Sequence, residues 1–219
     1  MIGRFALATA LALASASVYA TTYTLEPDYT QGVFRWNHLG FSSPAAQFSQ
    51  GTGTLEFEPA DPTRASVNVM IPLSTFNTGV PALDEDFRSS DFFDTARFPS
   101  ATFKSTRVER GGMKDQLKIT GELNLHGVTK PVTLDVRIIK IGTNPRTSLP
   151  TVGFEAMTTL QRSDFGLGKY VPQVSDEIQM QIIVQAVEAK SYADYLKAQE
   201  AKEAAKAKDA TKAKGATRK

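Results

Sequence analysis

The chain has 219 residues, with 25 lysines and arginines against 23 aspartates and glutamates, and it contains no cysteine. The lack of cysteine excludes a disulfide framework, thiolate metal sites and thiol nucleophiles. The net charge of +2 averages three unlike segments: residues 1–20 carry one arginine, residues 21–187 carry 15 basic and 18 acidic groups, and residues 188–219 carry 9 and 5. Because the central segment is mildly acidic, the composition argues against a nucleic-acid-binding core.

The first 20 residues have the layout of a secretory signal peptide. Arg4 supplies one early positive charge, an uncharged apolar stretch follows from Phe5, and the segment ends in the small-residue sequence Val18-Tyr19-Ala20. This layout predicts cleavage after Ala20 and export from the cytoplasm. A membrane-spanning helix needs about 20 consecutive apolar residues, whereas Thr9 and two serines interrupt this stretch, so a retained anchor is the weaker interpretation.

In residues 21–187 the apolar residues recur with a period of two, which is typical of strands with one buried face. The pattern predicts eight or nine strands, separated by turn sequences such as Gly111-Gly112, His126-Gly127 and Asn144-Pro145. Short connections between long strands favour consecutive antiparallel pairing. We therefore predict an all-β fold: an extended eight-stranded antiparallel β-barrel, wide enough to be filled by side chains or to hold one small ligand.

Two features of this barrel stay open from the sequence. Gly51, Gly53 and Gly121 fall on the predicted inward face, where they either make room or mark bends and bulges. An outer-membrane barrel would show aromatic girdles at both ends of its strands. The aromatic residues of this chain do not gather at the strand ends, so a soluble barrel is the preferred interpretation.

Residues 81–98 depart from the period of two. Apolar side chains recur at helical spacing from Leu83 to Phe93, and Asp84 is the predicted N-cap. We expect a short helical lid over about residues 82–94, lying across one end of the barrel.

Residues 188–219 form an appendage that contains ten alanines and eight lysines. Alanine, lysine and glutamate are strong helix formers, which predicts a helix from about Ser191 to about Lys208 that fades toward Gly215. The simplest interpretation is a solvated, helical to disordered tail. The alternative is a weak electrostatic contact with anionic lipid headgroups or cell-wall polymers, which salt should abolish.

Four motifs stand out along residues 21–187. They are Phe34-Arg35-Trp36-Asn37-His38-Leu39-Gly40, the stretch from Phe87 to Phe103, the turn Leu125-His126-Gly127-Val128-Thr129-Lys130-Pro131-Val132, and Arg162-Ser163-Asp164-Phe165-Gly166-Leu167-Gly168 followed by Asp176-Glu177-Ile178. In this order they resemble the YceI-like polyisoprenoid-binding family, over Thr22 to about Val187. The resemblance implies a lipocalin-like barrel in the periplasm whose apolar pore holds a long isoprenoid or similar amphiphile, with no catalysis and no cofactor. Some members of the family carry a histidine at the position of Phe87. The phenylalanine makes the mouth of the pore less polar in this chain.

The residues themselves give little support for an enzyme. His38 and His126 are the only histidines, and neither has a second histidine at metal-ligand spacing. The acidic residues between Asp84 and Asp94 lack the alternating oxygen ligands and the glycine of a calcium loop, and no serine lies in a nucleophile elbow.

A pore lined by aromatic and aliphatic side chains can hold a prenyl tail without polar contacts, because each buried CH₂ contributes about 0.8 kcal/mol. His38 and Arg88 are the predicted donors to a polar headgroup. The residues predicted to line the pore or its mouth are Phe34, Trp36, His38, Leu55, Val69, Phe87, Arg88, Phe92, Phe103, Leu123, Phe154, Phe165 and Ile182. For Phe34, Trp36, Phe103 and Phe154, an ordinary filled barrel core is the alternative.

Three hypotheses follow. The first is a periplasmic, non-enzymatic carrier of an isoprenoid or other long-chain lipid, with a quinone and a prenyl phosphate among the candidates and a homodimer left open. The second is an enzyme acting on a lipid or quinone, which requires His38 to meet an acidic partner in a cleft. The third is an interaction or stress-response module with a solid barrel, whose cationic tail contacts anionic components of the cell envelope.

Overall fold

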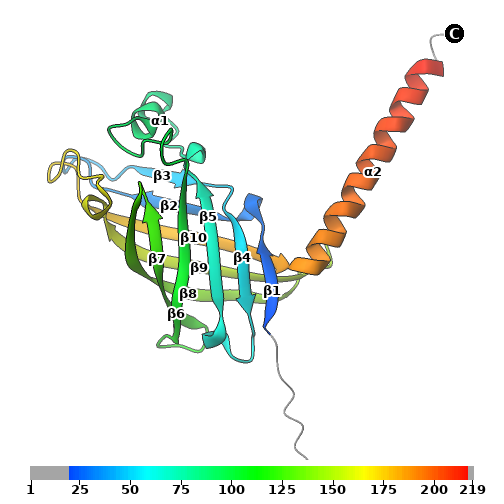
Figure 1. Ribbon diagram of the computed structural model, residues 1–219, viewed down its shortest axis with the longest axis horizontal. Coiled ribbons are helices and arrows are strands. Elements are labelled where there is room, and N and C mark those ends of the chain that lie inside the picture. The colour runs from blue at the N-terminus through cyan, green and yellow to red at the C-terminus, as the bar shows by residue number, and fades with distance from the viewer. Residues whose placement is uncertain (1–19, 217–219) are drawn as a thin grey trace, which may run out of the picture.

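The computed structural model describes residues 20–216, with side chains described as far as Lys208. An antiparallel sheet of ten strands curls into a closed barrel (Figure 1). The strands are β1 (Thr21–Leu25), β2 (Gln31–Arg35), β3 (Ala45–Phe48), β4 (Thr52–Phe57), β5 (Ser66–Pro72), β6 (Ser100–Arg110), β7 (Gln116–Leu125), β8 (Val128–Thr143), β9 (Pro150–Gln161) and β10 (Glu177–Glu188). The predicted signal peptide falls on residues 1–19, which lie outside the described residues, and on Ala20.

Eight strands form the closed ring, in the order β1-β4-β5-β6-β7-β8-β9-β10, and β10 returns to pair with β1. The predicted eight-stranded antiparallel barrel is therefore confirmed, with β2 and β3 as additional strands. β10 pairs with β2 over Gln179–Ile183 and with β1 over Ala186–Glu188. β1 and β2 thus occupy one strand position, interrupted by a short 3₁₀ turn at Pro27–Tyr29.

Because consecutive ring strands are antiparallel, their connections alternate between the two ends of the barrel. One end carries the β2–β3, β7–β8 and β9–β10 connections and the helix α1 (Pro81–Arg88), and we call this end the mouth. The β4–β5, β6–β7 and β8–β9 connections lie at the other end. The long helix α2 (Ala189–Ala216) leaves β10 at that end and projects away from the barrel (Figure 1).

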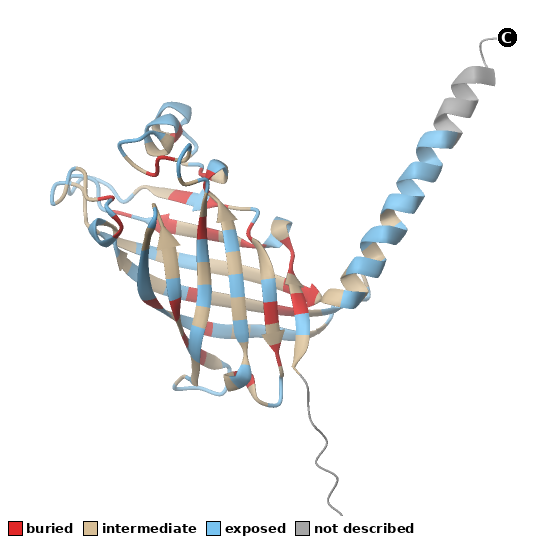
Figure 2. Ribbon diagram, in the orientation of Figure 1, coloured by how far each residue is buried: buried red, intermediate tan, exposed pale blue. Residues whose placement is uncertain are grey.

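The barrel interior is apolar and is organised in two parts. Toward the mouth, Phe34, Phe48 and Phe76 pack against one another with ring centroids 5.4–5.7 Å apart. Toward the other end, Leu25 and Phe57 are fully buried. Along the strands, buried and exposed residues alternate as the period of two requires (Figure 2).

The inward glycines mark close backbone approaches and do not open space. A Cβ atom on Gly53 would lie 2.0 Å from the Asn68 carbonyl oxygen, and one on Gly121 would lie 2.5 Å from the Phe103 ring. Gly121 also pairs with Ser105 at the register shift in β6. The interpretation as a bulge therefore applies to Gly121, whereas Gly53 marks a close approach of two backbones.

The lid helix is shorter than predicted and begins differently. α1 ends at Arg88 and not near residue 94, because the Ser89 amide turns back onto the carbonyls of the last turn. The N-cap is Val80, so the prediction that Asp84 caps the helix was wrong. The buried Asp84 carboxylate instead accepts hydrogen bonds of 2.7 Å from both the backbone amide and the hydroxyl of Thr78. It thereby fixes the turn that leads into the helix.

The tail helix is longer than predicted, because it starts directly after β10 and continues to Ala216. The Glu188 side chain accepts hydrogen bonds from the amides of Lys190 and Ser191 and so caps its first turn. Beyond its contacts with β1 and β10 the helix is solvated, and residues 201–208 are all exposed. In the described part of the chain, no helix is both long and apolar enough to cross a membrane.

Candidate functional site

A large chamber opens at the mouth of the barrel, beneath α1 and the β9–β10 connection. Its volume is about 630 Å³, which lies in the usual range for pockets that bind small molecules. Its walls are mainly aromatic and aliphatic. The apolar lining comprises Phe34, Trp36, Phe48, Ile71, Leu73, Leu83, Phe87, Phe92, Phe93, Ala101, Leu123, Leu125, Leu160, Phe165, Leu167, Val174, Ile178 and Met180.

A second chamber of about 140 Å³ lies deeper in the barrel. The two chambers share five lining residues, namely Phe48, Ile71, Leu123, Leu160 and Met180. The two chambers therefore lie next to each other inside the barrel, with these five side chains between them. Only Thr30, Gln31 and Thr158 bring polar side chains to the lining of the deeper chamber.

Twelve of the thirteen residues predicted from the sequence line this pore. Phe34, Trp36, His38, Phe87, Phe92, Leu123 and Phe165 border the mouth chamber, and Leu55, Val69, Phe103, Phe154 and Ile182 join Leu123 around the deeper one. The alternation of strand residues could identify them, because it determines which side chains point inward. Their part in binding a ligand stays a prediction.

Arg88 is the thirteenth residue, and it is not part of the lining. Its guanidinium donates a 3.2 Å hydrogen bond to the carbonyl oxygen of Phe76 and so ties α1 to the preceding segment. His38 lies just beyond β2, where a bridge to Val174 holds it at the mouth. Among the described residues, the His38 imidazole has no hydrogen bond or ion pair with a carboxylate, so the acidic partner required by an enzyme is not in place.

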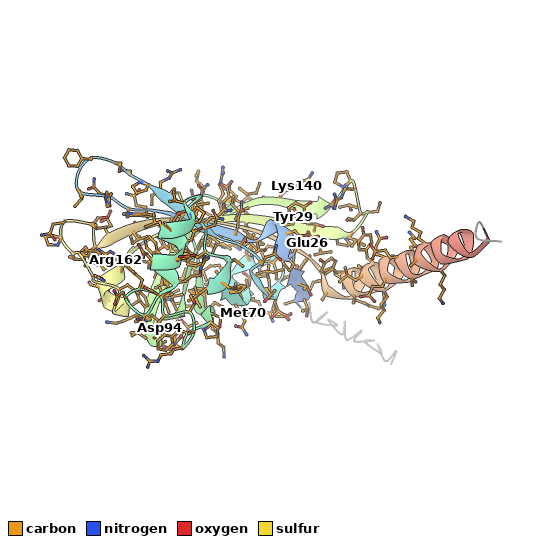
Figure 3. All side chains as sticks on the ribbon, turned by 90° about the horizontal axis from the view of Figure 1, so that it is seen from above. Glu26, Tyr29, Met70, Asp94, Lys140 and Arg162 are labelled. Atoms are coloured by element: carbon orange, nitrogen blue, oxygen red, sulfur yellow. The ribbon has the colours of Figure 1, made fainter. Side chains whose placement is uncertain are left out.

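Arg162 lines the mouth chamber but directs its donors to the backbone. Nε donates to the carbonyl of Ser175 at 2.8 Å, Nη2 to that of Val174 at 3.0 Å, and Nη1 to those of Lys169 and Leu167. Burial lowers the pKa of the guanidinium, and nearby Asp176 partly offsets this shift. Arg162 therefore shapes the β9–β10 connection from inside, at the end of the barrel opposite α2 (Figure 3).

One ion pair spans the mouth. Lys169 in the β9–β10 connection places Nζ 2.5 Å from a carboxylate oxygen of Asp91, which follows the lid helix 78 positions earlier in the chain. The hydrogen bond to Asp91 raises the pKa of Lys169. The same ammonium lies 5.7 Å from the ring centre of Phe92 and 5.1 Å from that of Tyr170. The segment after the lid and the opposite rim are thus joined by an ion pair and by the cation–π contact between Lys169 and Phe92.

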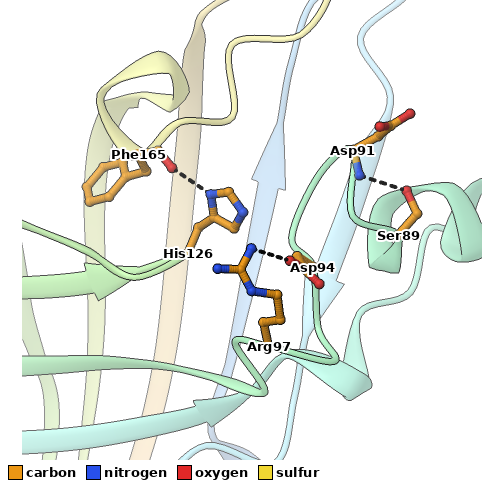
Figure 4. Close-up of polar contacts among 6 residues, drawn as sticks. All are labelled: Ser89, Asp91, Asp94, Arg97, His126 and Phe165. Carbon is orange, nitrogen blue, oxygen red and sulfur yellow. Dashed lines mark hydrogen bonds and ion pairs between the residues drawn. The ribbon is translucent and has the colours of Figure 1, made fainter.

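His126 and the turn after the lid build the frame around the mouth (Figure 4). His126 Nδ1 lies 3.1 Å from the carbonyl oxygen of Phe165, and its ring packs edge-on against Phe98. Asp94 and Arg97 form a 3.3 Å ion pair in the segment that returns to β6. These contacts give His126 a place in a turn and not in the pore. Within the described residues, no group of three or more histidines and carboxylates is arranged to hold a metal ion.

Comparisons with known proteins agree with this architecture. A family model described as the YceI-like domain matches residues 23–186. Protein YceI of Escherichia coli O157:H7 is 36% identical over 182 residues, which cover 82% of this chain and 94% of that protein. Protein YceI of Salmonella arizonae is 35% identical over 188 residues, covering 85% and 96%.

Solved structures share the fold at lower identity. BcnA of Burkholderia cenocepacia superimposes with a TM-score of 0.63 at 22% identity, covering 71% of this chain and 95% of that one. A polyisoprenoid binding domain from Saccharophagus degradans gives a TM-score of 0.59 at 14% identity, covering 77% and 99%.

Proposed function

Since this chain belongs to the YceI-like family, we propose that it is a periplasmic carrier that holds a polyisoprenoid or similar long amphiphilic lipid in the pore of its barrel. The observation that carries the proposal is the apolar interior of the barrel, where a chamber of about 630 Å³ at the mouth lies beside a deeper one of about 140 Å³. A neighbour in fold is itself described as a polyisoprenoid binding domain.

The chemistry of the lining favours a long hydrocarbon tail with a small polar head. Each CH₂ that leaves water contributes about 0.8 kcal/mol, so a tail in the deeper chamber needs no polar partner. At the mouth, Arg162 and Lys169 are already engaged by protein oxygens. The His38 imidazole and the Ser42 hydroxyl also line the mouth chamber and can donate to a headgroup.

The proposal assigns a binding role without catalysis. The neighbour in fold from Saccharophagus degradans is described as a binding domain. His38 has no carboxylate partner among the described residues to orient its ring as a general base. A lipid held by apolar contacts alone also leaves the protein unchanged, as a carrier requires.

The periplasmic location rests on the sequence of residues 1–20, which have the layout of a cleaved signal peptide. The intact mass of the protein recovered from the periplasmic fraction tests it. We expect the mass of a chain that begins at Thr21. A protein retained in the cytoplasm at full length would contradict the location.

Native mass spectrometry and lipid extraction test the carrier proposal directly. Protein purified without denaturation should contain a long-chain lipid in a one-to-one complex. Ala101 is buried in the wall of the mouth chamber, so Ala101→Phe should fill space and reduce the bound lipid severalfold. Thr102→Phe, on the exposed face of the same strand, is the matched control and should keep it. An empty wild-type pore, or equal lipid content in both variants, would contradict the proposal.

The cationic C-terminal tail suggests a second, separate binding role. Residues 188–219 hold 9 basic and 5 acidic groups, and the helix that contains most of them projects from the end opposite the mouth. We propose that this helix makes a salt-sensitive contact with an anionic surface of the envelope. It would hold the carrier near a membrane or cell-wall polymer without taking part in lipid binding.

A further inference from the structure

The β2–β3 connection presents an apolar tip beside the mouth. Phe41 is 92% exposed and Leu39 is 50% exposed. Leu39 and Gly40 have positive φ angles of 57° and 77°, and the Gly40 amide donates a 2.8 Å hydrogen bond to the Asn37 side chain. Since a leucine rarely adopts this backbone region, the turn is held by its contacts in a shape that keeps both apolar side chains in solvent.

The β9–β10 connection supplies the rest of the same rim. The Leu39 amide donates to the Gln173 carbonyl at 3.1 Å, and the Ser175 amide donates to the Asn37 carbonyl at 3.0 Å, so the two loops are bound together. Tyr170 in this connection is 58% exposed, and Lys169 lies over its ring. We call Leu39, Phe41, Lys169 and Tyr170 the mouth rim.

The mouth rim is continuous with the opening of the pore. His38 and Ser42, which flank the tip on either side, line the mouth chamber, as do Lys169 and Tyr170. Residues 36–55 contain no aspartate, glutamate, lysine or arginine. The tip can therefore leave water without carrying an ionised side chain with it, which would be costly.

We propose that the mouth rim inserts into the headgroup region of a lipid bilayer and so places the opening of the pore against the membrane. The proposal rests on the proposed function, because a lipid cargo must be collected from or delivered to a bilayer. Phe41 and Leu39 supply the apolar tip. Tyr170, with Lys169 over its ring, is a residue type that settles at headgroup level, where an aromatic ring meets the acyl boundary.

A bilayer suits this surface better than a protein partner does. Stable protein interfaces bury about 800 Å² on each side, far more than a few side-chain tips at the edge of an opening can supply. Shallow insertion into a membrane needs only a few apolar side chains on an uncharged loop. A second copy of the chain is the competing occupant, and the test below separates the two.

Flotation of the full mature chain with phosphatidylcholine vesicles tests the proposal. This zwitterionic lipid has no net charge, so the cationic tail at the far end of the barrel contributes little. We expect the wild type to float with the vesicles and Phe41→Ser to lower its partition coefficient about tenfold. Met157→Ser is the matched control, because Met157 is 61% exposed in β9 and is not part of the mouth rim or of the pore lining. It should bind as the wild type does.

Lipid content and mass in solution, measured on the same samples, identify the cause of any failure. Phe41→Ser should keep the lipid content of the wild type, because Phe41 does not line the pore. A wild type that carries lipid but does not bind vesicles would overturn the docking proposal and leave the carrier intact. So would a change from dimer to monomer on Phe41→Ser, which would assign the mouth rim to a protein interface. A wild type that floats but contains no lipid would instead contradict the proposed function.

Discussion

Thr30 carries a buried hydroxyl that makes no hydrogen bond to stabilise the fold. Among the described residues, its Oγ1 is the one buried side-chain polar atom without a hydrogen bond. Thr30→Val removes this group at nearly constant shape, so we expect the free energy of unfolding to stay the same or rise by up to about 1 kcal/mol. Urea denaturation measures the difference.

Thr75 provides the matched control for this substitution. Its hydroxyl shares one proton between the carbonyls of Pro72 at 2.7 Å and Ser49 at 3.0 Å, and it accepts a hydrogen bond from the Ser49 amide. Thr75→Val leaves those groups without a partner and should lower the free energy of unfolding by about 1–3 kcal/mol. Equal losses for Thr30→Val and Thr75→Val would mean that Thr30 has a polar partner after all.

At the residue scale, the sequence predicted which apolar side chains line the pore far better than it predicted the contacts of the polar side chains at the mouth. Alternation along a strand determines which side chains point inward, which is why Phe34 and Phe154 could be placed. The Lys169–Asp91 pair spans 78 positions and depends on where two irregular segments meet, so no local pattern could indicate it. Arg88 was predicted at the mouth for its charge, but the nearby Phe76 carbonyl takes its hydrogen bond.

At the scale of elements, the lid should depend on pH through Asp84. The hydrogen bond from the Thr78 hydroxyl is the main cause that holds the pKa of this carboxyl below its usual value of 3.8. A lowered pKa in the folded state means that the ionised carboxylate stabilises the fold at pH values above 3.8. This contribution is lost as the pH falls through the lower, folded-state pKa.

Asp84→Asn is therefore expected to cost about 1 kcal/mol at neutral pH and to cost progressively less as the solution is acidified below pH 3.8. Urea midpoints of the wild type and the variant, measured across this range, should converge. Glu85→Gln, on the exposed side of the same helix, is the control and should leave the midpoint unchanged. A gap between wild type and Asp84→Asn that persists at low pH would show that the carboxylate charge is not what stabilises the turn.

We expect the ion pair between Lys169 and Asp91 to slow the release of a ligand from the pore, because it joins the lid segment to the opposite rim. Both side chains are partly exposed, so the pair and its cation–π contacts are together worth about 1 kcal/mol. Lys169→Gln should therefore speed the release of a fluorescent prenyl analogue by roughly threefold to tenfold, and salt should speed release from the wild type in the same direction. Stopped-flow fluorescence measures both effects.

Lys130→Gln is the matched control for this experiment. Lys130 forms a 3.6 Å ion pair with Asp164 outside the pore lining, so its loss should leave the release rate unchanged. If Lys169→Gln released the analogue at the wild-type rate, the lid would not be held by this contact.

At the scale of the whole molecule, closure of the barrel follows from features that the sequence displays. Long strands in which apolar and polar residues alternate, joined by short connections, pair with their neighbours in the chain. Closing such a sheet into a ring pairs its two edge strands with each other. The interruption between β1 and β2 was not predicted, although Pro27 lacks the amide that a continuous ladder would use. The length of α2 was underestimated because capping by Glu188 starts the helix directly at the end of β10.

The molecule consists of the barrel, for which we propose lipid binding, and a projecting cationic helix. This division predicts that the helix can be removed without changing the stability or the lipid content of the barrel. Residues 197–219 carry eight basic and three acidic groups, and the main contacts of α2 with the barrel are to β1 and β10. Deleting residues 197–219 should change the free energy of unfolding by less than about 0.5 kcal/mol and leave the lipid content unaltered, because no pore residue lies in this segment.

The deletion should abolish salt-sensitive binding to phosphatidylglycerol vesicles, as flotation at low ionic strength would measure. Replacing Lys197, Lys202, Lys206 and Lys208 with glutamine keeps a helix-forming sequence while removing charge, and it should weaken binding in the same way. Binding that survived both changes would transfer the anionic contact from the tail to the barrel.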